Sequence, residues 1–191
     1  MPTTDLEENK IKQAQPEEGN DTAQNEREIR KNIFKNERVN FILGVILVIF
    51  SLYLTISFIS FFFTGSIDQS KVENLSVGEL SSIGNEIQNW TGAFGAYLSN
   101  LMINRWMGIS AFIVSLWLYV VGRRFMKVAH TRMIRFTISC ALSIIVLSLF
   151  FGFIFMHSYN NTFLYLGGYH GYYATLWLNA WIGPWGTALF I

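Results

Sequence analysis

Apolar positions along the chain gather into long uncharged runs separated by short polar segments. Residues 1 to 36 are polar, with no aromatic residue before Phe34. Such a segment cannot bury enough apolar surface to offset the cost of ordering it, so we expect a disordered cytoplasmic tail. Asn40 to Ile67 carries no charge, and residues 68 to 89 are expected to form a polar loop after it. Its apolar centre exceeds the roughly 20 residues that cross a bilayer, which predicts a first membrane span at about residues 40–64.

The next apolar stretch, Trp90 to Gly122, is too long for one span. As a single helix it would measure about 50 Å at 1.5 Å per residue, against a hydrocarbon core of about 30 Å. Asn104 and Arg105 also interrupt it. We therefore predict two pieces, an interfacial helix at about 90–104 and a second span at about 106–122. In this arrangement Arg105 lies at the membrane surface and needs no partner in the hydrocarbon.

A third span is predicted at about 136–156, an uncharged run that follows a short basic loop. An aromatic-rich interfacial helix at about 169–182 then ends at the Gly183-Pro184 break, and a last apolar segment begins at Trp185. We expect this segment to be a fourth span whose polypeptide continues beyond Ile191 into a cytoplasmic domain. The predicted fold is all-α: a transmembrane domain over residues 37–191, built as a four-helix membrane bundle with two interfacial or re-entrant outer helices.

An internal repeat at an offset of 76 relates the two interfacial helices. Its first copy has Gly92, Gly95, Tyr97 and Ser99, and its second copy has Gly168, Gly171, Tyr173 and Thr175. A glycine-containing break follows each copy, at Trp106-Met107-Gly108 and at Gly183-Pro184-Trp185-Gly186. The same orientation in both copies indicates a parallel repeat. The glycines could allow close helix packing or could form turns at the membrane entry, and the sequence leaves both interpretations open. The residues assigned to these structural roles are Gly92, Gly95, Gly108, Gly167, Gly168, Gly171, Gly183, Pro184 and Gly186.

Charge is scarce and unevenly distributed. Charged residues make up 14% of the chain, and no Asp or Glu occurs from Ile87 onward. Lys and Arg near membrane spans favour the cytoplasmic side. The basic segments before the first span and after the second one therefore predict that both termini are cytoplasmic. The residues expected to determine this topology are Arg30, Lys31, Lys35, Arg38, Arg123, Arg124, Lys127, Arg132 and Arg135.

The sequence offers little chemistry. It has no Walker-type phosphate loop, no His-Glu-x-x-His motif and a single cysteine, Cys140. We expect no catalytic residue, no cofactor-binding residue and no metal ligand in this chain.

Two glycine-rich stretches resemble the membrane region of the FtsK/SpoIIIE DNA translocases. The first is NWTGAFGAYLSNLM…MGISAFIVSLWLYVVGRRF and the second is GGYHGYY…IGPWGTALFI. The matching positions are Gly92, Gly95, Ala96, Leu98, Gly108, Ala111, Arg123 and Arg124, then Gly167, Gly168, Gly171, Ile182, Gly183, Pro184 and Gly186. Arg105 departs from the pattern, because family members tend to be apolar there.

The resemblance implies a membrane anchor that acts in bacterial cell division and chromosome segregation. It would tether a cytoplasmic ATP-driven motor to the septum, in the cytoplasmic (inner) membrane. ATP, magnesium and DNA would bind only that motor, which is absent from this chain. The expected partners are membrane lipid, further copies of the chain (a hexamer) and division-septum proteins. A small transporter or channel subunit, or a free-standing structural membrane protein, remains an alternative.

Overall fold

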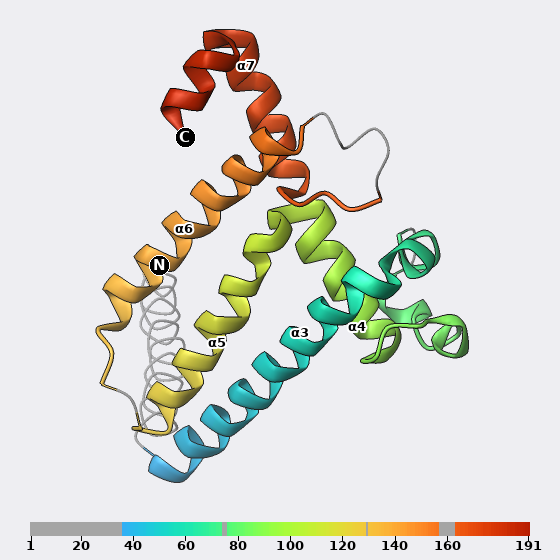
Figure 1. Cartoon of the computed structure of the whole chain (residues 1–191). Coiled ribbons are helices and arrows are strands. Elements are labelled where there is room, and N and C mark those ends of the chain that lie inside the picture. Colours follow the sequence, from blue (N-terminus) through green and yellow to red (C-terminus); the bar gives the residue numbers. More distant parts are fainter. Residues whose placement is uncertain (1–35, 74–75, 129, 157–162) are drawn as a thin grey trace, which may run out of the picture.

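The computed structural model describes residues 36–73, 76–128, 130–156 and 163–191, and in these ranges all regular structure is helical. The prediction of an all-α fold is confirmed. The main helices are α3 (Glu37–Val72), α4 (Gly92–Ser99), α5 (Ala111–Phe125), α6 (Met133–Ile154) and α7 (Gly168–Phe190). A π-helical segment, η3 (Asn100–Met107), and a 3₁₀ turn, η4 (Gly108–Ser110), join α4 to α5 (Figure 1). Two further 3₁₀ turns, η1 (Val77–Glu79) and η2 (Gly84–Glu86), lie between α3 and α4.

Helix α3 extends well past the predicted first span. It begins after Asn36, whose side chain accepts the Arg38 N–H at 3.2 Å, a typical N-cap contact. Its 36 residues measure about 54 Å, so it exceeds the hydrocarbon core by several turns. The polar loop expected from residue 68 therefore begins only after Val72, and Asp68 belongs to the helix.

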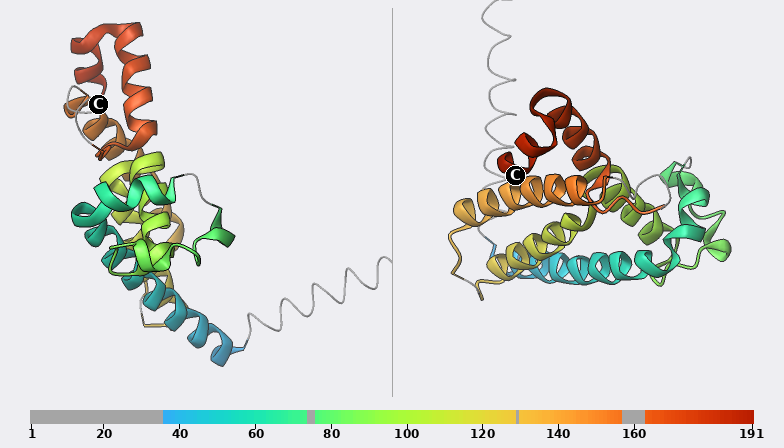
Figure 2. Two further views of the ribbon diagram at one scale, coloured as in Figure 1. Left: turned by 90° about the vertical axis from the view of Figure 1, so that its right-hand side faces the viewer. Right: turned by 45° about the horizontal axis from the view of Figure 1, so that its top comes forward.

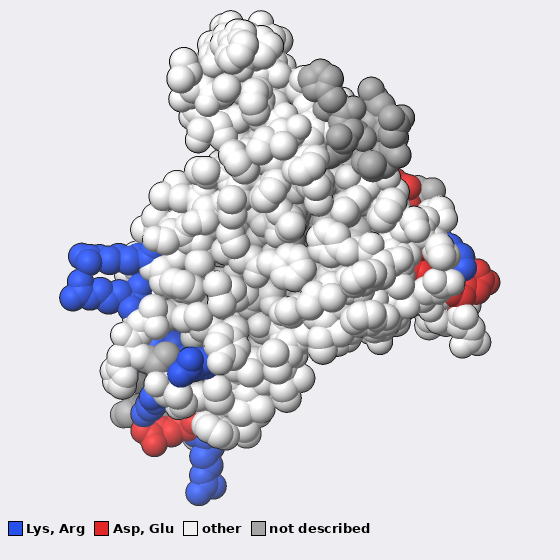
Figure 3. All heavy atoms as spheres, viewed as in Figure 1, with Lys and Arg blue, Asp and Glu red and all other residues white. Residues whose placement is uncertain are grey.

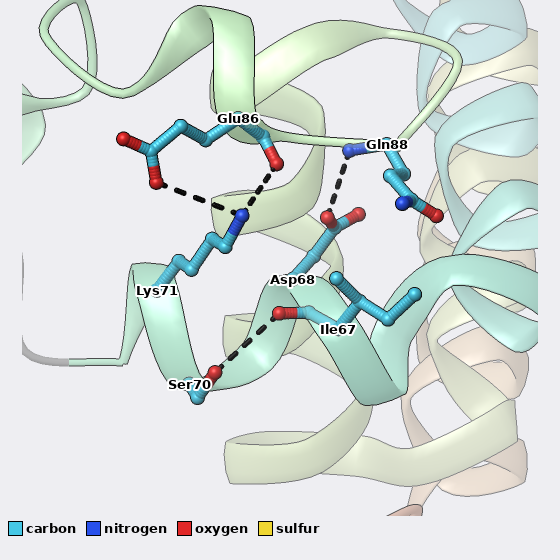
Figure 4. A network of polar contacts seen from close by, with 6 residues as sticks. All are labelled: Ile67, Asp68, Ser70, Lys71, Glu86 and Gln88. Carbon is cyan, nitrogen blue, oxygen red and sulfur yellow. Dashed lines mark hydrogen bonds and ion pairs between the residues drawn. The ribbon is translucent and has the colours of Figure 1, made fainter.

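Asp68 and Lys71 hold the following loop against the end of α3. Asp68 is fully buried, and one of its carboxylate oxygens accepts the Gln88 N–H at 2.8 Å. Lys71 donates to the Glu86 carbonyl at 2.7 Å and forms an ion pair with the Glu86 carboxylate at 3.6 Å. Figure 4 shows both side chains reaching from α3 toward the 86–88 segment. Hydropathy alone places Asp68 outside the helix, because a hydropathy profile contains no information about contacts between residues about 20 positions apart.

The second apolar stretch is bent rather than straight. Helical structure runs without interruption from α4 through η3, including Asn104 and Arg105, and the chain then turns at Gly108 into α5 (Figure 1). The turn lies at Gly108, within the glycine-containing break predicted at residues 106–108, whereas the helix continues through the predicted end of the interfacial piece at 104. Helix α5 begins at Ala111 rather than at 106 for the same reason.

The last two helices repeat this course. Helix α6 covers Met133–Ile154, against a predicted span of 136–156. Helix α7 is interrupted at Gly183, beside Pro184, and the short piece beyond the break folds back (Figures 1 and 2). Three stretches of the described chain are long and apolar enough to cross a membrane, namely Glu37–Val72, Gly92–Phe125 and Met133–Ile154.

The buried core lies where α3, η3 and α5 meet. Its apolar members are Leu54, Phe58, Phe61, Ile103 and Ala111. Phe58 and Phe112 pack edge to face with ring centroids 5.4 Å apart, which fixes α5 along α3.

Candidate functional site

Glycines with positive φ lie at two corresponding points in each half of the chain, the first half being α3 to α5 and the second α6 and α7. Gly92 (φ 75°) begins α4, and Gly168 (φ 67°) begins α7. The breaks that follow are Gly108 (φ 67°, ψ −146°) and Gly183 (φ 73°, ψ 170°). Both breaks occupy a region of backbone conformation that is essentially restricted to glycine. Each half therefore has a helix that starts and ends on a glycine which no L-residue replaces without strain.

A second pair of glycines packs against the preceding long helix. A Cβ on Gly95 would lie 2.7 Å from the Ser57 hydroxyl of α3, and one on Gly171 would lie 2.8 Å from the Ser148 hydroxyl of α6. Both distances are too short for a real contact, so these positions admit only glycine without movement of the helices. Close approach of this kind is the usual role of small residues between membrane helices.

The serines opposite these glycines hydrogen bond to the same helices. Ser57 donates to the Gly95 carbonyl at 2.7 Å, and its hydroxyl lies 2.7 Å from that of Ser99. Ser148 donates to the Gly167 carbonyl at 2.6 Å. Each half thus contains a serine on its long helix that hydrogen bonds to the start of the next helix.

The two halves meet at Gly108. The Ile109 N–H donates to the Leu166 carbonyl at 2.8 Å. A Cβ on Gly108 would collide with the Leu166 carbonyl, and one on Gly168 would collide with the Trp106 carbonyl. The break of the first half and the helix start of the second half are therefore in direct backbone contact.

Asn104 strengthens this junction. Its amide nitrogen donates to the Phe163 carbonyl and to Asn100, both at 3.1 Å, and its amide oxygen accepts the Tyr165 N–H at 3.1 Å. The side chain is almost fully buried. The polar residue that interrupts the apolar stretch is thus a tie between segments about 60 positions apart.

The remaining predicted structural residues differ in their surroundings. A Cβ on Gly167 would lie 2.7 Å from the Ser148 carbonyl oxygen, so this glycine is also tightly packed. Gly92 and Gly183 have open space around them, and Gly186 faces only Ile182 of its own helix. At Gly92 and Gly183 the positive φ is the only feature that requires glycine, and Pro184 follows the second of them.

Sequence reasoning missed a close contact between α3 and α5. Gly44 of α3 and Gly122 of α5 face each other, and a Cβ on either would lie 2.6–2.7 Å from the other's carbonyl oxygen. About two helical turns away, Ser51 donates to the Ser115 carbonyl at 2.7 Å. In each helix the two small residues are seven positions apart, and this spacing is the signal that could have revealed the contact.

The basic residues gather at one end of the molecule. In Figure 3, which has the view of Figure 1, most of the blue side chains lie at the end where α3 and α6 begin and α5 ends, beside one red group, and the other red groups lie at the opposite end with a smaller blue patch. Lys127 forms an ion pair with Glu37 at 2.5 Å, and the Arg123 guanidinium lies 5.7 Å from the centre of the Tyr119 ring. Arg30, Lys31 and Lys35 lie outside the described residues. The other six residues expected to determine the topology are described, namely Arg38, Arg123, Arg124, Lys127, Arg132 and Arg135.

Arg105 has a partner close to the first loop. Its guanidinium donates to the Glu73 carbonyl at 2.5 Å, directly after α3 ends. Arg105, which the sequence predicts to lie at the membrane surface, therefore ties η3 to the loop that follows the long helix. In the same loop, hydrogen bonds from the Ser76 N–H and hydroxyl lower the pKa of the Glu79 carboxyl.

Within the described ranges, no three His, Cys, Asp or Glu side chains are grouped as metal ligands would be. The polar groups that do converge are serines, asparagines and backbone carbonyls between helices. This arrangement holds helices together, and its chemistry is that of packing.

Comparison with known proteins identifies the chain. A family profile, described as the 4TM region of DNA translocase FtsK/SpoIIIE, matches residues 36–191. No curated protein and no solved structure shows significant similarity to the chain. The match covers every helix described above, from the cap of α3 to the last turn of α7. The chain is a membrane protein that belongs to the FtsK/SpoIIIE DNA translocase family, of which it contains the transmembrane region.

Proposed function

We propose that this chain is the membrane anchor of a DNA translocase, which tethers an ATP-driven motor to the division septum. The family match over residues 36–191 is the observation that carries the proposal. The tightly packed α3 and α5 suit such a role, because an anchor must resist the force that its motor generates. ATP, magnesium and DNA would bind the motor, and this chain would supply no catalytic group.

The orientation follows from the charges at the two ends of the bundle. The basic residues at the start of α3 and around the α5–α6 connection face the cytoplasm in this proposal, because Lys and Arg concentrate on that side. The described acidic residues other than Glu37 lie at the opposite end, namely Asp68, Glu73, Glu79 and Glu86. Both termini are then cytoplasmic.

Four spans fit the same arrangement. The segment from Trp185 follows its glycine break as α5 follows Gly108, and we assign it to a fourth span that enters beside α6. The α4–η3 segment and the first part of α7 then lie at the outer membrane surface. Their exposed aromatic residues, including Trp106, Trp177 and Trp181, suit an interface, where Trp is enriched.

Reporter fusions test the orientation. Alkaline phosphatase, which is active only outside the cytoplasm, is fused after Gly78 in one variant and after Lys127 in another. We expect activity at the first site and none at the second. The reverse pattern would invert the topology and refute a cytoplasmic motor.

Imaging tests the tether at the septum. The full chain carrying a cytoplasmic fluorescent protein at its N-terminus is expressed in a dividing rod-shaped bacterium, with a membrane dye as reference. We expect fluorescence to concentrate at the division site beyond the dye signal, and crosslinking to give homo-oligomers up to hexamers. A uniform signal that follows the dye would contradict the septal role.

A further inference from the structure

A groove of about 650 Å³ opens at the basic end of the bundle, between the end of α5 and the start of α6. Its basic lining consists of Arg124, Arg132, Arg135 and His130. Met133 and Ile134 of the first turn of α6 complete it, and Ile134 is 78% exposed. The groove thus combines three guanidinium groups with apolar side chains at the point where a membrane helix begins.

The three arginines have no carboxylate partner among the described residues. Glu37 is the acidic residue described at this end of the molecule, and it is engaged by Lys127. Arg123 lies against Tyr119. Arg124, Arg132 and Arg135 line the groove, whereas Arg38, Arg123 and Lys127 are not part of its lining.

The position of these charges is unfavourable for α6 alone. The start of a helix carries partial positive charge, which acidic residues normally offset. Helix α6 has no acidic residue in its first turn, and Arg132 and Arg135 add positive charge there. An anion in the groove would remove this repulsion, and guanidinium groups bind phosphate through paired hydrogen bonds.

We propose that this groove binds the phosphate headgroup of an anionic phospholipid. A phosphodiester would satisfy the arginines, and the acyl chains would run along Met133 and Ile134 into the bilayer. Basic pockets between membrane helices bind acidic headgroups in this way, and the apolar lining favours a lipid over a free phosphate ion. Binding requires only that the α5–α6 connection lie at a membrane surface, so it does not depend on the septal tether.

Native mass spectrometry of the full chain in detergent micelles tests this binding, with phosphatidylglycerol and phosphatidylcholine added separately. We expect the wild-type chain to prefer phosphatidylglycerol by on the order of tenfold. The triple variant Arg124→Gln/Arg132→Gln/Arg135→Gln should lose this preference. The matched control, Arg38→Gln/Arg123→Gln/Lys127→Gln, removes the same number of charges from the same end and should keep it.

Three results would overturn the proposal. One is an equal loss of preference in both triple variants, which would mean that diffuse charge attracts the lipid. Another is a groove variant that still prefers phosphatidylglycerol as the wild type does. The last is displacement of the lipid by inorganic phosphate at equal concentration, which would identify a free-anion site. Circular dichroism and gel filtration establish that each variant is folded, and the single variant Arg132→Gln, expected to lose roughly threefold, replaces a triple that does not fold.

Discussion

The first half of the chain, α3 to α5, and the second half, α6 and α7, repeat one course of the backbone but differ in how much they bury. In the first half α5 returns along α3, and Leu54, Phe58 and Phe61 become buried between them. In the second half the segment after the break has little to pack against. Trp185 is 87% exposed and Leu189 is 91% exposed.

This difference distinguishes a feature that the local sequence determines from one that depends on contacts between distant segments. Glycines with positive φ bend both halves at corresponding positions, whether or not a partner helix is present. The bend is therefore a local property of the chain. Burial of large apolar side chains depends instead on a second span lying closely along the first, as α5 lies along α3.

The largest effect should come from placing a side chain at the break of the first half. Gly108→Ala would strain the backbone and drive a methyl group into the Leu166 carbonyl. Strain costs about 1–3 kcal/mol and overpacking costs a similar amount, so we expect a loss of about 3 kcal/mol or more in free energy of unfolding. Unfolding by SDS in mixed micelles measures it.

Gly183→Ala is the matched test in the second half. Its backbone strain is the same, but nothing lies within 4 Å of the added methyl group, so we expect only about 1–3 kcal/mol. Equal effects at Gly108 and Gly183 would show that the contact between the halves contributes nothing.

The next effect should come from the interface between α3 and α5, since the described residues of the second half have no corresponding interface. In Gly122→Ala, the new Cβ lies 2.7 Å from the Gly44 carbonyl oxygen and 2.9 Å from Val48, so α3 and α5 must separate. We expect a loss of about 1–3 kcal/mol by the same SDS titration. Gly84→Ala, in open space, should change stability by less than about 0.5 kcal/mol. A neutral Gly122→Ala would mean that the close packing of α3 on α5 is dispensable.

Much of the helix pattern could be predicted because it depends on local sequence. Uncharged runs locate α3 and α6, and Gly108 and Gly183 fall within the glycine-containing breaks that the repeat predicts. The repeat also pairs Gly92 and Gly95 with Gly168 and Gly171 correctly, since each pair has matching backbone or packing geometry. Glycine carries this information because few other residues adopt its conformations.

The contacts between distant segments could not be predicted in this way. The polarity of Asp68 predicts a loop at this position. In the structure Asp68 is buried near the end of α3, where its carboxylate accepts the Gln88 N–H. Asn104 likewise interrupts an apolar run in the sequence but ties two halves together in the structure. Hydropathy measures the preference of a residue for lipid over water. It does not describe a polar group that is buried against other parts of the protein and hydrogen bonded there.

A substitution of Asn104 tests the hydrogen bonds that join the two halves. Asn104→Ala removes hydrogen bonds to the Phe163 carbonyl, the Tyr165 N–H and the Asn100 side chain. Leaving buried polar groups unpaired costs about 1–3 kcal/mol, and we expect about 2 kcal/mol in the SDS titration. Asn179→Ala is the control in the second half. Its amide makes a weak contact with the Met156 sulfur at 3.4 Å, so its loss should be below about 1 kcal/mol. If both variants lose the same stability, the position of Asn104 between the halves has no special role.

The smallest effects should come from the two serines that face the glycine-started helices, and they test how equivalent the halves are. Ser57→Ala removes the hydrogen bond to the Gly95 carbonyl and leaves the buried Ser99 hydroxyl without its neighbour. Ser148→Ala removes a single hydrogen bond, to the Gly167 carbonyl. Hydrogen bonds between membrane helices contribute about 0.6 kcal/mol on average, so we expect a loss of about 1 kcal/mol for Ser57→Ala and about 0.5 kcal/mol for Ser148→Ala. The exposed Ser66→Ala should be neutral within the error of the titration. A loss at Ser57 with none at Ser148 would mean that the second half keeps the backbone course of the first without its hydrogen bonding, because α6 and α7 would then be held by glycine packing alone.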